Sequence, residues 1–327
     1  MKRLPTIVLI SIAMLLAGCG AAGAITPAPT PVATPGFGTG LNNQIPIHTD
    51  VPGAPAHVHL DPAQATAELQ VALVASELVL GPNRFAVGLL DAKGQNIRQA
   101  LVHFHYFDLT NPASPVVESE ADATRIASPD DLTVIYAQDR AFKRAGNWGL
   151  EVQARFPDGT GSIKRIGFKV LDTSATIKPG QAAPAADTPT AAAVNNDLSK
   201  ISSAQQPVPA FYELSLAAAL KNGKPTALLF ATPAFCQTRF CGPMYDVTTS
   251  LQKKYAGRVN FVHVEVFTGL PNPAATNFQL APAMQAFGLT TEPWLFLIGS
   301  DGVVKYRVEG IYSQPEIEPQ MEALFAR

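Results

Sequence analysis

The chain has 327 residues, of which 47% are hydrophobic, and it carries a formal net charge of −2. This length allows two ordinary domains of roughly 100 to 200 residues each. Because the charge is nearly balanced and no basic stripe carries interleaved aromatic residues, nothing in the composition favours binding to nucleic acid.

The first residues of the sequence have the pattern of a short targeting signal. Met1-Lys2-Arg3 is positively charged, residues 7–16 are apolar but too few to span a bilayer comfortably, and Leu16-Ala-Gly-Cys19 follows. Residues 1–19 therefore resemble a bacterial lipoprotein signal peptide. The resemblance implies cleavage before Cys19 and lipidation of that residue, which would anchor the protein to the extracytoplasmic face of the cell membrane. An uncleaved membrane anchor is the alternative, and it also places the rest of the chain outside the cytoplasm.

Two segments rich in Pro, Ala and Thr divide the remaining chain. Residues 20–62 contain too few large apolar side chains to order a core, which predicts a semi-extended tether. His57-Val-His59 lies near its end. Residues 173–206 contain a second such stretch, which predicts a linker between two folded domains.

Residues 63–172 have the pattern of β-strands. Apolar or alternating runs at 84–90, 100–107, 148–156 and 163–170 are separated by turn sequences such as Asp91-Ala-Lys-Gly94. This pattern predicts an all-β sandwich. Gly146-Asn-Trp-Gly-Leu-Glu151, together with Asp91-Ala-Lys-Gly94, is similar to the extracytoplasmic YtkA-like, immunoglobulin-type sandwich. That resemblance implies a fold, but it says almost nothing about the activity of the domain.

Residues 207–327 change to an α/β rhythm. A helix ends near Asn222, an apolar strand follows, and the sequence then predicts a helix at 243–255, a strand at 259–267 and a helix at 274–287. Strands at 294–299 and 303–309 form a hairpin through Asp301-Gly302. The capping box Ser313-Gln-Pro-Glu316 opens a final helix.

The pair in Cys236-Gln-Thr-Arg-Phe-Cys241 directly follows the first of these strands. With this order of elements, and with Glu292-Pro293 directly before the hairpin, residues 207–327 are similar to the thioredoxin-like family. The resemblance implies that Cys236 attacks, that Cys241 resolves, and that Pro293, preceded by Glu292, binds the substrate backbone. The implied activity is thiol-disulfide exchange with extracytoplasmic protein thiols or disulfides, and it needs no cofactor.

The cysteine spacing departs from the family pattern, because four residues rather than two separate the thiols. On a continuous helix, residues five apart have Cα atoms ~8 Å apart, beyond the ~7 Å limit for a disulfide. Gly242-Pro243 predicts that the helix begins after Cys241, so that the cysteines flank a loop. The helix N-terminus and Arg239 would both favour a thiolate.

Three alternatives remain open. The domain could be a binding module without turnover. It could deliver copper as Sco-type proteins do, with His263 as the only histidine after Cys241. His103-Phe-His105 places two imidazoles on one face of a strand, where they are either two exposed polar positions or part of a copper or zinc site.

Overall fold

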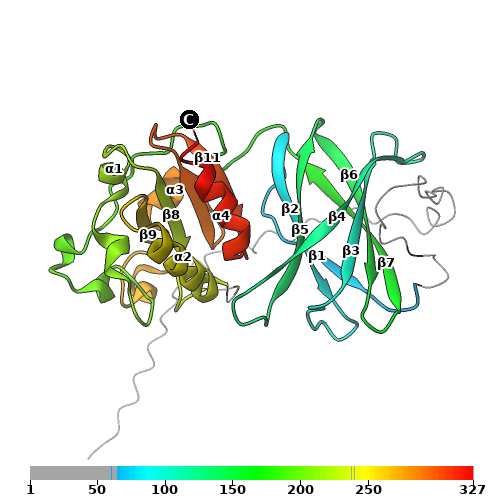
Figure 1. Ribbon diagram of the computed structural model, residues 1–327, viewed down its shortest axis with the longest axis horizontal. Coiled ribbons are helices and arrows are strands. Elements are labelled where there is room, and N and C mark those ends of the chain that lie inside the picture. The colour runs from blue at the N-terminus through cyan, green and yellow to red at the C-terminus, as the bar shows by residue number, and fades with distance from the viewer. Residues whose placement is uncertain (1–59, 61–64, 237, 239, 327) are drawn as a thin grey trace, which may run out of the picture. The chain divides into compact units, whose positions relative to one another are not determined.

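The computed structural model describes residues 60, 65–236, 238 and 240–326 (Figure 1). The predicted signal peptide, Cys19, most of the tether and His57-Val-His59 lie outside these described residues. Among the residues that are described, no helix is both long and apolar enough to cross a membrane.

The first part of the chain forms one antiparallel sheet of seven strands, in agreement with the all-β prediction. Its order is β1-β2-β5-β4-β3-β6-β7. The strands are β1 (Gln70–Leu73), β2 (Gly81–Leu90), β3 (Leu101–Asp108), β4 (Val116–Ala127), β5 (Val134–Phe142), β6 (Gly146–Arg155) and β7 (Gly161–Val170).

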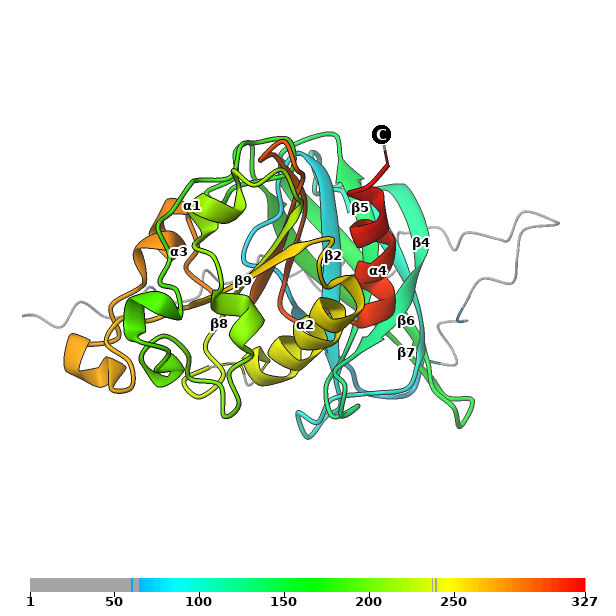
Figure 2. The ribbon, with the colours of Figure 1, turned by 60° about the vertical axis from the view of Figure 1, so that its left-hand side comes forward.

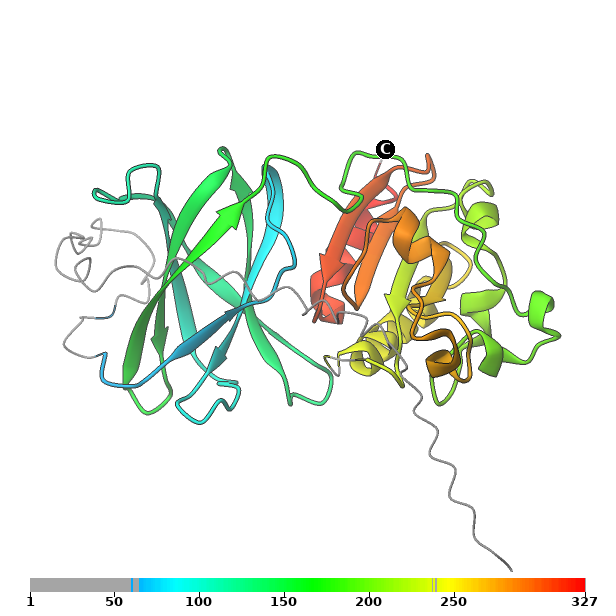
Figure 3. The same cartoon turned by 180° about the vertical axis from the view of Figure 1, so that it is seen from behind.

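The strands do not form the two separate sheets of the predicted sandwich, because the long strand β4 belongs to both halves. It pairs with β3 up to Ala123 and with β5 from Thr124 onward. The two halves thus face each other as one folded, nearly closed sheet (Figure 3). Between them Phe85 of β2 contacts Phe104 of β3 at 5.8 Å and Phe168 of β7 at 5.1 Å between ring centroids.

The second part of the chain forms a four-stranded sheet of order β11-β10-β8-β9. Strands β8 and β9 are parallel, whereas β10 is antiparallel to both β8 and β11. The strands are β8 (Thr226–Ala231), β9 (Asn260–Glu265), β10 (Trp294–Ile298) and β11 (Val304–Glu309). The helices are α1 (Leu216–Ala219), α2 (Cys241–Tyr255), α3 (Pro282–Ala286) and α4 (Gln314–Ala323).

Helices cover both faces of this sheet, which explains why its two central strands, β8 and β10, are almost entirely apolar. Leu229 and Leu295 belong to the core that includes residues of α2 and α4. Their neighbours Leu228 and Phe296 point to the other face, into the core that includes residues of α1 and α3. Figure 2 shows α2 and α4 on one side of the sheet and α1 and α3 on the other.

Local signals placed several of these elements correctly. Ser313 caps α4 in a reciprocal capping box with Glu316, as its sequence predicts. The helix predicted at 274–287 is wrong as a continuous element. It is divided into a 3₁₀ turn, η6 (Pro273–Thr276), and the short helix α3, because Asn277 and Phe278 adopt left-handed φ angles of 51° and 52°.

Residues 173–206, which were predicted to be a linker, form backbone hydrogen bonds with residues of the second sheet and its hairpin turn. Gly180 N–H donates to Val304 O at 2.8 Å, and Ala183 N–H donates to Gly302 O at 2.9 Å. The segment also contains two 3₁₀ turns, η3 (Ala192–Val194) and η4 (Leu198–Lys200). The low content of large apolar residues predicted a linker without contacts to the sheet. Backbone hydrogen bonds do not depend on side chains, so the composition gave no sign of them.

Candidate thiol site

The two cysteines lie beside each other beyond the C-terminal end of β8. The strand ends at Ala231, and a turn follows in which Phe235 N–H donates to Thr232 O at 3.1 Å. Helix α2 begins at Cys241 itself, two residues earlier than predicted, while Cys236 stays outside the helix. The spacing of five along a continuous helix therefore does not apply. Both thiols are free, and their sulfurs lie within 4.8 Å of each other.

Cys236 is the accessible thiol, and its surroundings favour the thiolate. The backbone N–H of Cys241 donates to its Sγ at 3.2 Å, and the Thr238 hydroxyl lies 3.3 Å from it. Hydrogen bonding from the Cys241 thiol is the largest cause that lowers the pKa of Cys236, to about 5, with smaller help from Thr238 and against the opposing effect of partial burial. A low-pKa, solvent-accessible cysteine at a helix N-terminus is the form that reacts as a nucleophile. Arg239, which was expected to contribute, lies outside the described residues.

Cys241 has the opposite character. Its side chain is completely buried, and its thiol is the hydrogen-bond donor to Cys236. That hydrogen bond, burial and the nearby carboxylate of Glu292 all raise its pKa above the ordinary value. The sulfur of Cys236 therefore favours the nucleophilic thiolate form, whereas the sulfur of Cys241 stays protonated.

Of the two predicted substrate-binding residues, Glu292 lies beside the cysteines. One carboxylate oxygen of Glu292 lies within 4.8 Å of both sulfurs. The Glu292–Pro293 peptide bond is cis, and Pro293 directly precedes β10. Pro293 O accepts from Gly310 N–H at 2.9 Å, which ties this bend to the end of β11.

The sequence places Glu265 two residues after His263 on the same strand, and the structure places it at the end of β9 opposite Ala231. Its side chain is only 6% exposed. Ser203 N–H donates to Oε1 at 2.5 Å, whereas Oε2 has no hydrogen-bond partner among the described residues. Burial raises the pKa of Glu265 to about 7. The signal in the sequence was the one acidic residue within the predicted strand at 259–267.

His263 does not join the cysteines. It is 3% exposed, its Nδ1 lies 2.7 Å from Tyr212 Oη, and its Nε2 lies 3.0 Å from Ala231 O. Burial lowers the pKa of this histidine to about 4. Since both ring nitrogens already have partners inside the protein, the Sco-type ligand set considered from the sequence is not formed.

His103 and His105 are buried rather than exposed, at 2% and 7%. The interpretation of the pair as two exposed polar positions is therefore wrong. The strands beside β3 cover them with further polar side chains, which the sequence pattern did not indicate.

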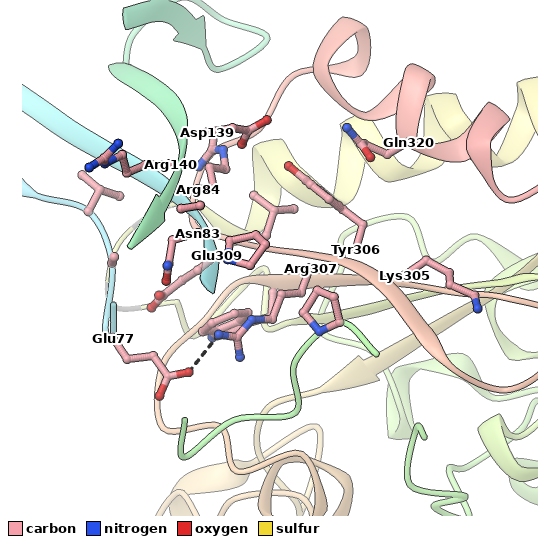
Figure 4. A pocket seen from close by; sticks show the side chains of 17 residues that line it. Glu77, Asn83, Arg84, Asp139, Arg140, Lys305, Tyr306, Arg307, Glu309 and Gln320 are labelled. Carbon is pink, nitrogen blue, oxygen red and sulfur yellow. Dashed lines mark hydrogen bonds and ion pairs between the residues drawn. The ribbon is translucent and has the colours of Figure 1, made fainter. Parts of the chain in front are cut away.

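A pocket of about 490 Å³ is lined by residues of both sheets. Its lining includes Arg84 and Asp139 from the first sheet and Tyr306 and Arg307 from the second (Figure 4). Arg307 pairs with Glu77 at 2.9 Å, which is the dashed contact in Figure 4. Neither cysteine lines this pocket, so it is separate from the thiol site.

No family model matches the sequence, and no curated protein matches it either. Several solved structures are similar to part of the chain. A thioredoxin-family thiol:disulfide interchange protein from Chlorobium tepidum is 20% identical, with 38% of this chain and 95% of that chain covered and a TM-score of 0.29. A copper-bound variant of FetP from uropathogenic Escherichia coli is 10% identical, with coverages of 32% and 91% and a TM-score of 0.24. CopC from Methylosinus trichosporium is 14% identical, with coverages of 32% and 97% and a TM-score of 0.22.

Proposed function

We propose that the protein is an extracytoplasmic thiol-disulfide oxidoreductase that acts through Cys236 and Cys241. The observation that carries this proposal is the pair of adjacent free thiols with opposed pKa shifts, one accessible and one buried. The order of strands and helices, with the cysteines after β8, supports a thioredoxin-like domain at residues 207–327. The seven-stranded antiparallel sheet supports an all-β domain at 63–172, which we propose to be YtkA-like.

The exchange follows from this arrangement. The Cys236 thiolate attacks one sulfur of a partner disulfide, forms a mixed disulfide with it and releases the other partner sulfur as a thiolate. Cys241 then gives up its proton and attacks Cys236 Sγ, which forms the Cys236–Cys241 disulfide and releases the second partner sulfur. The partner gains two electrons and the pair loses two. Oxidation of a partner dithiol is the same sequence in reverse.

A combination of insulin reduction and trapping tests the proposal. We expect wild-type protein to reduce insulin disulfides with dithiothreitol as electron source, and Cys236→Ser to fall to the background rate. Cys241→Ser should accumulate a mixed disulfide at Cys236, because the resolving thiol is missing. Equal, near-background rates for wild type and Cys236→Ser, with no trapped adduct in Cys241→Ser, would reject an exchange activity.

We propose the location from the N-terminal signal alone. Cleavage before Cys19 and acylation of that residue would tether the protein to the membrane, where its partners are extracytoplasmic protein thiols or disulfides. Mass spectrometry should find acyl chains on Cys19, and Cys19→Ala should yield a soluble or uncleaved product. Normally processed, membrane-bound Cys19→Ala protein would contradict the anchor.

Copper delivery is a second candidate function, since one specific observation favours it. The sulfurs of Cys236 and Cys241 and one oxygen of Glu292 lie within 4.8 Å of one another, as donors to a single ion would. Thiolate is a soft ligand that selects Cu(I). Stoichiometric Cu(I) binding that is lost in Cys236→Ser or Cys241→Ser, without insulin reduction by the wild type, would favour this function.

A further inference from the structure

The face of the first sheet that points away from its aromatic core carries a cluster of imidazoles and carboxylates. Strand β3 is central here and pairs with β4 on one side and β6 on the other. His103 is opposite Asp122 of β4, and His105 is opposite both Glu120 of β4 and Glu151 of β6. Because directly opposed residues in a sheet project from the same face, all five side chains share one surface.

The Nδ1 atoms of the two histidines are oriented by carboxylates. His103 Nδ1 lies 2.6 Å from Asp122 Oδ1, and His105 Nδ1 lies 3.2 Å from Glu151 Oε1. Glu151 is itself fixed, because Arg165 Nε donates to its other oxygen at 2.7 Å. A hydrogen bond from Nδ1–H to a carboxylate fixes the tautomer that leaves Nε2 as the ligand atom.

The Nε2 atoms converge on a single carboxylate. Glu120 Oε2 lies 3.1 Å from His105 Nε2 and 3.9 Å from His103 Nε2. The two rings lie 4.9 Å apart between centroids, and one ligand atom from each of His103, His105 and Glu120 lies within 4.8 Å of the others. The histidines are almost fully buried, whereas the Glu120 side chain is 40% exposed. The three donor atoms are thus close enough to bind one ion, and Glu120 is the one of the three residues that solvent reaches.

We propose that His103, His105 and Glu120 form a metal site for a divalent ion of the Cu²⁺ or Zn²⁺ class. Two imidazoles and one carboxylate are donors of the hardness that these ions prefer, and three protein ligands leave a position open for water or another ligand. Glu120 and Asp122 also place two carboxylates beside the imidazoles, which agrees with binding of a dication.

This inference does not depend on the thiol chemistry, and the test separates the two. The full chain is prepared with Cys236→Ser and Cys241→Ser to remove sulfur ligands, and Cu²⁺ or Zn²⁺ is added in a calorimetric titration. We expect one high-affinity equivalent, and the electron paramagnetic resonance spectrum of the Cu²⁺ form should show nitrogen coupling from two imidazoles.

Single substitutions in this background identify the ligands. His105→Asn should remove one nitrogen from the spectrum and weaken binding by more than the 10–100-fold loss that is typical for an outer partner, whereas Asp122→Asn should weaken it by about 10-fold. Glu120→Gln is the variant that keeps the proposal testable if His105→Asn does not fold, because Glu120 is partly exposed. The matched control is Glu213→Gln, which removes an exposed carboxylate outside the cluster. An affinity and spectrum unchanged in both Glu120→Gln and His105→Asn, or an effect of Glu213→Gln equal to that of Glu120→Gln, would overturn the proposal.

Discussion

Replacing the buried carboxyl of Glu265 should change how stability depends on pH. The ordinary pKa of 4.5 is raised to about 7 by burial in the folded protein. Between these values the folded state holds a proton that the unfolded chain has lost, so the wild type loses stability as the pH rises from 4.5 through 7. A pKa difference of about 2.5 corresponds to about 3 kcal/mol.

The variant Glu265→Gln has nothing to ionise at this position, and its amide oxygen can still accept from Ser203 N–H. Its free energy of unfolding, relative to that of the wild type, should therefore increase by about 3 kcal/mol between pH 4 and pH 8. Urea unfolding followed by circular dichroism at one-unit pH steps measures this difference. Subtracting the two curves cancels the contributions of other groups, including His263.

Glu213→Gln provides the control, because it makes the same substitution at an exposed glutamate. A flat curve for Glu265→Gln would refute the reasoning, since it would mean that water or a partner solvates the second oxygen of Glu265. A curve that falls rather than rises would show that the charged form is the one stabilised by folding.

Two further predictions follow from single contacts. Alkylation of the Cys236-containing peptide, quantified by mass spectrometry across pH, should show a midpoint near 5 in the wild type, and Cys241→Ala should raise that midpoint by at least about one pH unit because the main hydrogen-bond donor is lost. Cys241→Ser retains a donor and should stay closer to the wild type, so equal midpoints in the two variants would contradict this role of the thiol. Ser313→Ala removes the side-chain acceptor for Glu316 N–H at the start of α4 and should lower the free energy of unfolding by about 1 kcal/mol in denaturant titrations, whereas an unchanged value would show that the cap is satisfied by water.

Signals that depend on neighbours in sequence predicted most of the elements. The apolar run before Cys236, the Asp301-Gly302 turn and the Ser313 capping box each specify local geometry, and each lies where the sequence indicated. The helix predicted at 274–287 failed because left-handed residues at 277 and 278 are not excluded by apolar periodicity. Helical spacing of apolar residues also occurs in compact loops that pack onto a core.

The sequence predicted the features of the thiol site that follow from residues adjacent along the chain. It did not predict the features that depend on which side chains are buried. The sequence indicated that the two cysteines are neighbours, but it could not show that Cys241 is buried at the start of α2 while Cys236 remains accessible. Their opposed pKa shifts result from that difference in environment. Glu265 reaches this end of the sheet only because β9 pairs in parallel with β8.

The histidine cluster also could not be predicted in full from the sequence. Its third donor, Glu120, lies beside the histidines only because of the register in which β3 and β4 pair. Alternation along β3 places His103 and His105 on one face, which the sequence shows. Only the pairing of β3 with β4 sets Glu120 opposite His105, and a register shifted by one residue would place Ser119 or Ala121 there instead. The same strand then continues into the other half of the sheet, where it pairs with β5. The pairing of β3 with β4 shifts by one residue between Ser119 and Val117, but it is regular from Ser119 to Ala123, and the pairing with β5 continues it from Thr124. The position of Glu120 opposite His105 therefore depends on this regular stretch.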